Sequence, residues 1–149
     1  MEPSTLLEAI QAAWSADAAL SGWIPDSRCY FGKVPPIASV EGQPTPNPEM
    51  PYARVEKPMG RGEGTRSNAG WYKDAEITFH VWTDNPEDGD TIGGEVERVF
   101  SQLLTWTNGA TLDSKFTPHS TTQVDQPEIS QWETVCTFTM RTWQARTDT

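Results

Sequence analysis

The sequence predicts an α+β fold, and three segments carry this prediction. Residues 75–83 alternate apolar and polar side chains, which is the period of a half-buried strand. Residues 92–104 repeat apolar side chains every three or four positions, as on one face of a helix. Residues 132–143 alternate again. Because only this one helix pattern lies between strand patterns, we expect a mostly antiparallel sheet of four to five strands with two helices packed on one face.

A first helix is expected at the N-terminal end. Thr5 and Glu8 have the spacing of a capping box, and apolar residues at helical spacing follow as far as Trp14. The next position on that face is Asp17, a polar residue that suits the end of a helix. We therefore expect the helix to end near residues 19–20, before a glycine.

Short strands and loops are expected between this helix and residue 75. Residues 28–32 and 52–56 are typical of brief strands. Six prolines fall in residues 34–51, which predicts an extended loop or arm, because proline lacks the N–H that helices and sheets use. Four glycines in residues 58–70 predict a second, flexible loop.

The second helix and the strands that follow it have recognisable ends. Residues 85–88 suit a helix start, since proline fits the first turn and carboxylates favour the N-terminal end of the helix dipole. Gly93 and Gly94 disfavour helix, which suggests a later start. Residues 108–109, Asn-Gly, are expected to cap the helix, and a strand is expected over residues 111–117. Apolar alternation places Trp82 and Trp143 on the faces opposite the core.

Composition limits the class of protein. The chain has 149 residues, a net charge of −10, a pI of about 4.5 and a mean hydropathy of −0.59. This is the size of one domain, residues 1–149. An acidic surface disfavours binding to nucleic-acid phosphates. No run approaches the roughly 20 apolar residues of a membrane span, and residues 1–4 lack the basic start of a secretory signal. We expect a soluble protein with no membrane partner, made and assembled in the cytoplasm.

The residues that carry chemistry form no known catalytic pattern. The two histidines, His80 on the polar side of a strand and His119 in an expected loop, lack zinc-site spacing. The two cysteines lie far apart, and Cys136 fits a small buried residue. The glycines of residues 60–64 do not match a phosphate-binding loop, and the acids of residues 84–90 lack the spacing of a calcium loop. We expect no enzyme activity, cofactor or metal, although a ligand or metal site using either histidine with these acids stays an alternative.

Charge is distributed unevenly along the chain. Residues 54–73 carry five basic side chains, whereas residues 84–97 carry six acidic side chains and no basic one. Two complementary patches on one chain suit head-to-tail self-assembly, which can close into a ring. Aromatic and arginine side chains are also frequent at interface hot spots. The interface residues predicted on this basis are Arg54, Lys57, Arg61, Arg66, Trp71, Tyr72, Asp84, Glu87, Asp88 and Asp90.

The order of these segments resembles that of a known family. The matching stretches run from residues 6–10 and 17–20, through Arg28-Cys29-Tyr30, Val34-Pro35-Pro36 and Pro51-Tyr52-Ala53-Arg54-Val55, to residues 77–82, the helix to Leu104 and a last strand through Phe138. In this order the chain resembles the tail-terminator, or tail-completion, proteins of long-tailed bacteriophages, which join heads to tails. It differs from them in its proline-rich segment 34–51 and its Gly/Arg-rich segment 58–70, either of which could be an arm.

The resemblance implies a non-enzymatic subunit of a ring, typically a hexamer, in the virion. Such a ring caps the tail tube at its head-proximal end, stops tube polymerisation and meets the head connector or a neck protein. DNA passes through its lumen without specific binding. A head-completion or neck protein of the same joint is a second possibility that the sequence leaves open.

Overall fold

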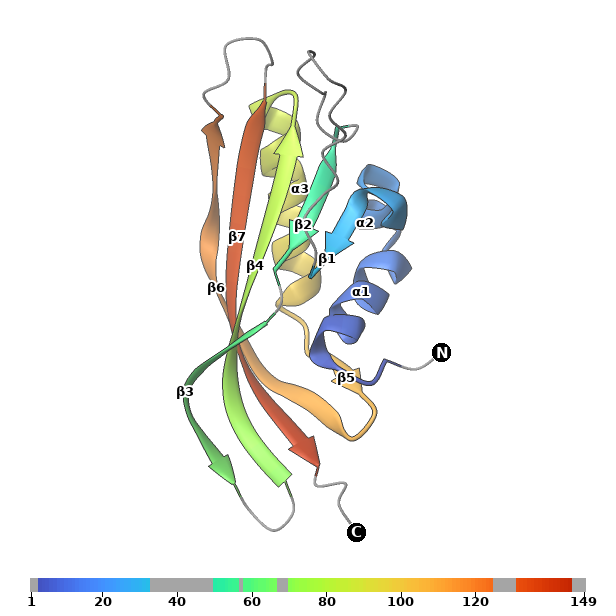
Figure 1. Cartoon of the computed structure of the whole chain (residues 1–149). Coiled ribbons are helices and arrows are strands. Elements are labelled where there is room, and N and C mark those ends of the chain that lie inside the picture. The colour runs from blue at the N-terminus through green and yellow to red at the C-terminus, as the bar shows by residue number, and fades with distance from the viewer. Residues whose placement is uncertain (1–2, 33–49, 57, 67–69, 125–130, 146–149) are drawn as a thin grey trace, which may run out of the picture.

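The structure, a computed structural model, describes residues 3–32, 50–56, 58–66, 70–124 and 131–145, with only the backbone described over 59–66. These residues form two layers, a curled seven-stranded sheet and a set of helices on one of its faces (Figure 1). The lower halves of the long strands extend beyond the helical layer (Figure 1). Most of the predicted loop 34–51 lies outside the described residues.

The elements follow one another in a simple order. They are α1 (Leu6–Ala16), α2 (Ala18–Trp23), a 3₁₀ turn (Asp26–Arg28), β1 (Cys29–Phe31), β2 (Tyr52–Val55), β3 (Met59–Arg66), β4 (Gly70–Thr83), α3 (Pro86–Phe100), β5 (Thr105–Trp106), β6 (Gly109–Gln123) and β7 (Trp132–Ala145). None of the helices in the described ranges combines the length and the apolar character needed to cross a membrane.

The fold belongs to the α+β class, as predicted, but its sheet has more strands than predicted and is mixed. Its strand order is β1-β2-β4-β7-β6-β5, and β3 pairs with the first half of β4. All pairings are antiparallel except β1 with β2, which is parallel. The predicted sheet of four to five mostly antiparallel strands was therefore too small. β5 has two residues, too few to show a periodicity, and β3 lies in a segment that was predicted as a loop.

The first helix is divided where one helix was predicted. Thr5 caps α1 by accepting a hydrogen bond from the backbone N–H of Glu8 at 3.2 Å, as the capping box predicts. Asp17 is extended, with φ −83° and ψ 120°, and its carboxylate accepts from the backbone N–H of Leu20 at 3.0 Å. The polar residue expected to end the helix thus ends α1 and also begins α2, which runs on through Gly22 to Trp23.

The segment predicted as the second loop contains a strand. Residues Met59–Arg66 pair with Trp71–Glu76, and β4 consequently begins at Gly70 rather than Ala75. The glycines of this segment conceal the strand in the sequence, because alternate glycines leave no apolar periodicity. Backbone pairing with the open edge of β4 forms it nevertheless.

The second helix starts where residues 85–88 predict, earlier than Gly93 and Gly94 suggested, and it ends earlier than predicted. α3 begins at Pro86, where the side chain of Asn85 accepts a hydrogen bond from the backbone N–H of Asp88 at 2.8 Å. It ends at Phe100, and Asn108 is instead the turn residue between β5 and β6, with φ +62°. Residue 119, expected in a loop, lies within β6.

The core lies between the sheet and the helices and matches the predicted apolar faces. Trp14 of α1 is fully buried and packs against Phe79 of β4 and Phe100 of α3, with ring centroids 6.3 and 6.4 Å away. Phe79 and Phe138 meet edge to face. The strand register places Trp82 and Trp143 on the opposite face, as predicted. No described helix covers that face (Figure 1).

Candidate assembly surfaces

The acidic segment before and within the start of α3 serves local structure at several of its positions. Asn85 Nδ2 donates to Asp84 Oδ1 at 3.0 Å and to Asp88 Oδ2 at 2.9 Å. These carboxylates therefore lie around the N-terminal cap of α3, where the helix dipole favours negative charge. Glu87 is exposed on the first turn.

Asp90 forms part of a junction between α3 and β6. Thr121 Oγ1 donates to its Oδ1 at 2.7 Å, and His119 Nε2 lies 3.4 Å from the same oxygen. Glu97 meets the other side of this histidine, with Oε1 3.0 Å from Nδ1 and Oε2 accepting the backbone N–H of His119 at 2.8 Å. The alternative reading paired a histidine with these acids, and the structure does bring His119 and Asp90 together. In the described part of the chain, however, no three potential ligands converge on a metal position.

The other histidine lies on the uncovered face of the sheet. His80 stacks on Trp82, with ring centroids 5.7 Å apart, and faces Arg54 across the β2–β4 pair. Its Nδ1 is 3.6 Å from Glu133 and its Nε2 is 3.6 Å from Glu56. Both distances exceed a good hydrogen bond, so the carboxylates and the histidine form a loose charged cluster.

The aromatic pair of the basic segment and the acidic segment lie at opposite ends of β4, whereas Arg54 of the basic segment pairs with His80 near the acidic end. Trp71 and Tyr72 begin β4 and Asp84 follows its end, so a strand rising about 3.3 Å per residue separates them by roughly 40 Å. Lys57 and the side chains of Arg61 and Arg66 lie outside the described residues. A contact of Trp71 or Tyr72 with the acidic segment would therefore join different copies, and it stays a prediction.

The negative charge is concentrated in the helical layer. The helices and their flanking residues contain nine acidic and two basic side chains, whereas the strands and their flanking residues contain five acidic and four basic ones among those described. The first group is Glu8, Asp17, Asp26, Asp84, Glu87, Asp88, Asp90, Glu95 and Glu97 with Arg28 and Arg98, and the second is Glu56, Asp74, Glu76, Asp113 and Glu133 with Arg54, Lys73, Lys115 and Arg141.

Three large apolar side chains are exposed where α3 ends against β6. Leu103, Leu112 and Phe116 are 58%, 47% and 43% exposed. Two hydrogen bonds hold this border together: Ser114 Oγ donates to the carbonyl of Phe100 at 2.7 Å, and the backbone N–H of Leu104 donates to Thr111 Oγ1 at 2.7 Å. We call the three exposed residues Leu103, Leu112 and Phe116 the β6 patch. Leu103 was predicted to face the core, but α3 ends before it.

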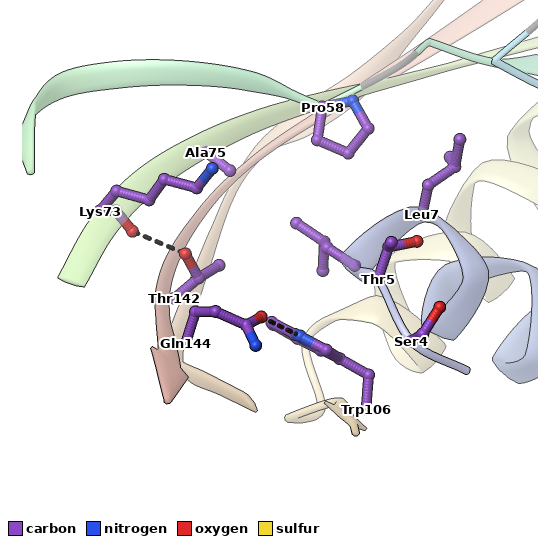
Figure 2. A pocket seen from close by; sticks show the side chains of 10 residues that line it. Ser4, Thr5, Leu7, Pro58, Lys73, Ala75, Trp106, Thr142 and Gln144 are labelled. Atoms are coloured by element: carbon purple, nitrogen blue, oxygen red, sulfur yellow. Dashed lines mark hydrogen bonds between the residues drawn. The ribbon is translucent and has the colours of Figure 1, made fainter. Parts of the chain in front are cut away.

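A groove opens between the start of α1 and the lower half of the sheet (Figure 2). Its volume is about 360 Å³. Its lining residues are Ser4, Thr5, Leu6, Leu7, Pro58, Lys73, Ala75, Trp106, Thr142 and Gln144. A second hollow continues from it along Trp71 and Tyr72. The two hollows share Lys73, Thr142 and Gln144.

Most polar side chains of this groove already form hydrogen bonds within the chain. Gln144 Oε1 accepts from Trp106 Nε1 at 2.8 Å, and Thr142 Oγ1 donates to the carbonyl of Lys73 at 2.9 Å (Figure 2). Ser4 donates to Glu8 through both its backbone N–H and its hydroxyl. Small-molecule sites present several convergent polar groups that fix the ligand, so this lining suits an apolar side chain better.

Neither cysteine offers a nucleophile. Burial, with a smaller effect of Glu97, raises the pKa of Cys136 to about 12, and burial raises the pKa of Cys29 well above its ordinary value. Both cysteines are free and buried, as the sequence suggested for Cys136. Their thiols stay protonated, and a protonated thiol does not attack electrophiles.

One solved structure shares the fold across almost the whole chain. It is described as "Virion of native gene transfer agent (GTA) particle", and its matching chain aligns with a TM-score of 0.67 at 16% sequence identity. The alignment covers 93% of this chain and 94% of that chain. The chain matches no protein-family profile, and no curated protein matches it. At this level of identity the likeness shows a common fold.

Proposed function

We propose that this protein is a structural component of a phage-like virion that caps the tail tube as a ring at the head-proximal end. In this role it stops tube polymerisation and forms the joint to the head connector or a neck protein. The observation that carries the proposal is the fold shared with a chain of a gene transfer agent virion over 93% of its length. The order of sequence segments, which resembles that of tail terminators, supports the same role.

The chemistry of the chain fits a structural rather than catalytic role. Its two buried thiols are protonated, and in that state neither acts as a nucleophile. The net charge of −10 suits a ring through which DNA passes without specific binding. We propose that the exposed carboxylates at the start of α3 line this channel.

Deleting the gene from the phage-like genome that encodes it tests the proposal. Electron microscopy of the resulting particles should show tails of uncontrolled, excessive length, and expression in trans should restore the normal length. Filled heads beside free tails of normal length would indicate the alternative, a head-completion or neck protein. Intact particles that assemble as before would exclude both roles.

A further inference from the structure

We propose that copies of this chain contact one another with the β6 patch of one copy docked in the groove of a second copy. This inference rests on the proposed ring, whose subunit contacts it specifies. It concerns different residues from the contact predicted between the basic and acidic segments. Because the patch and the groove share no residue, the contact is heterologous and can be repeated around a ring.

Charge disfavours a contact between two helical layers. The helical layer carries nine acidic against two basic side chains, so two such layers facing each other would repel. The strands carry nearly equal numbers of both signs, and several opposite charges are already neighbours, such as Asp74 and Arg141 at 3.6 Å. A copy of the same acidic protein can approach this layer without a large electrostatic cost.

The β6 patch has the character of a contact surface on its own. Leu103, Leu112 and Phe116 account for three of the four exposed large apolar side chains among the described residues. Leu112 lies at a bulge between Thr111 and Asp113, which interrupts the pairing with β7. β5 pairs only with the first two residues of β6. Beyond them, no other described strand lies at the outer edge of β6. Leu112 and Phe116 belong to this part of β6, where Phe116 also packs on Phe138 with ring centroids 5.7 Å apart, and Leu103 belongs to the segment between α3 and β5.

The groove complements the patch in shape and in charge. Its volume of about 360 Å³ accommodates a bulky apolar side chain, and the side chains of Trp106, Thr142 and Gln144 already form hydrogen bonds within the chain. Lys73 is the one charged residue among its described lining residues. Next to the patch, Asp113 follows Leu112 and has Arg141 as its cross-strand partner on β7. Asp113 is 55% exposed; Lys115 lies 3.9 Å away and is 81% exposed. Such a solvated pair is weak, which leaves Asp113 able to face Lys73 of the second copy.

A charge exchange tests this contact. Asp113→Lys and Lys73→Glu should each raise the dissociation constant for self-association about tenfold, and the double variant should return to within about threefold of the original. Sedimentation equilibrium of the full chain measures this. Glu87→Lys is the matched control in the helical layer and should leave association unchanged. An effect of Glu87→Lys with none from the other two would overturn the inference and favour the acidic segment as the contact.

Cross-linking tests the same contact when the free chain associates only weakly. Lys73→Cys and Asp113→Cys variants, mixed at high concentration and treated with a short bis-maleimide, should form a covalent dimer. Each variant alone should form little. The native cysteines are 4% and 0% exposed and should not react. Equal yields from the mixture and from the separate variants would refute the contact. The tail-length experiment does not depend on this result. The proposed function and the proposed subunit contact can therefore be refuted separately.

Discussion

Arg98 of α3 donates two hydrogen bonds to the carboxylate of Asp17, at 2.9 and 3.0 Å, across 81 residues of sequence. Asp17 is also the residue that divides α1 from α2 and caps α2 through the backbone N–H of Leu20. One carboxylate therefore fixes the start of one helix and the position of another. Arg98 is held in turn by Glu95 at 2.7 Å.

Replacing Asp17 should separate these two contributions. Asp17→Ala removes both the cap and the partner of Arg98, and loss of the cap alone should cost about 1 kcal/mol of unfolding free energy. Asp17→Asn keeps a capping side chain without its charge and should cost less. Urea denaturation measures both variants. Equal stability of Asp17→Ala and the unmodified chain would show that the junction is unimportant for folding.

The pH dependence of stability should change with the same substitution. The hydrogen bond from Leu20, followed by that from Arg98, lowers the pKa of Asp17 below its ordinary value of 3.8. A carboxylate of lowered pKa contributes stability that is full above the unfolded pKa and is lost as pH falls through the folded value. The stability difference between the original chain and Asp17→Asn should therefore be constant from pH 7 to about 5 and shrink below about 4. Thermal melts across this range measure it.

Two neighbouring glycines of α3 should respond oppositely to alanine. A Cβ on Gly93 would lie 2.8 Å from ring atoms of His119 and 3.0 Å from Thr134, whereas one on Gly94 would meet nothing within 4 Å. Gly94→Ala should stabilise the protein by about 0.5–1 kcal/mol through helix propensity. Gly93→Ala has the same propensity gain but should destabilise by about 1 kcal/mol, because overpacking costs more. Stabilisation by both would contradict the close approach of α3 to β6.

The two cysteines should be unreactive until the chain unfolds. Intact-mass measurement after maleimide treatment should find no label on the native protein and two labels in denaturant, because both thiols are buried and protonated. The Asp113→Cys variant is the positive control and should take up one label at once. Rapid labelling of the unmodified native chain would show that one of the buried positions opens.

The exposed acids at the start of α3 should affect DNA delivery more than assembly. Reversing Asp84 and Glu87 together leaves Asp88 and Asp90, which bond to Asn85 and Thr121, in place. Particles with this change should assemble with normal tails but deliver DNA less efficiently, because a polyanion would be retained in the channel. Gln11→Lys on the exposed side of α1 is the control. Normal delivery by the reversed particles would argue against a channel role.

Apolar periodicity made the centre of this fold predictable. Phe79 and Phe138 lie on strands in which apolar and polar side chains alternate, a pattern that can be recognised without knowing the rest of the fold. Both side chains are fully buried. β3 could not be predicted in the same way, because its pairing uses backbone groups and its glycines carry no pattern. The position of Leu103 depended on where α3 stops, and Ser114 bonds the carbonyl of the last helical residue from a distant strand.

The candidate surfaces were less accessible to sequence reasoning. Asp90 was selected for its charge, yet it bonds to Thr121 within the same chain. Leu112 and Phe116 lie four positions apart in a polar stretch. Their spacing indicates an exposed surface only when the structure shows that, beyond Ala110, no described strand pairs with the outer edge of β6. Lys73 belongs to the basic segment but was not among the predicted interface residues, because nothing in the neighbouring sequence shows that it borders a groove.

The sheet face that no described helix covers allows folding and assembly to be separated by mutational scanning. Thr78 of β4 and Thr137 and Thr139 of the neighbouring strand β7 lie on that face, while their neighbours in sequence face the core. A scan scored on the isolated chain should tolerate many substitutions at such positions and few at the alternating ones. Positions that become intolerant only when the same library is scored on finished particles then identify surfaces that face another protein or the DNA.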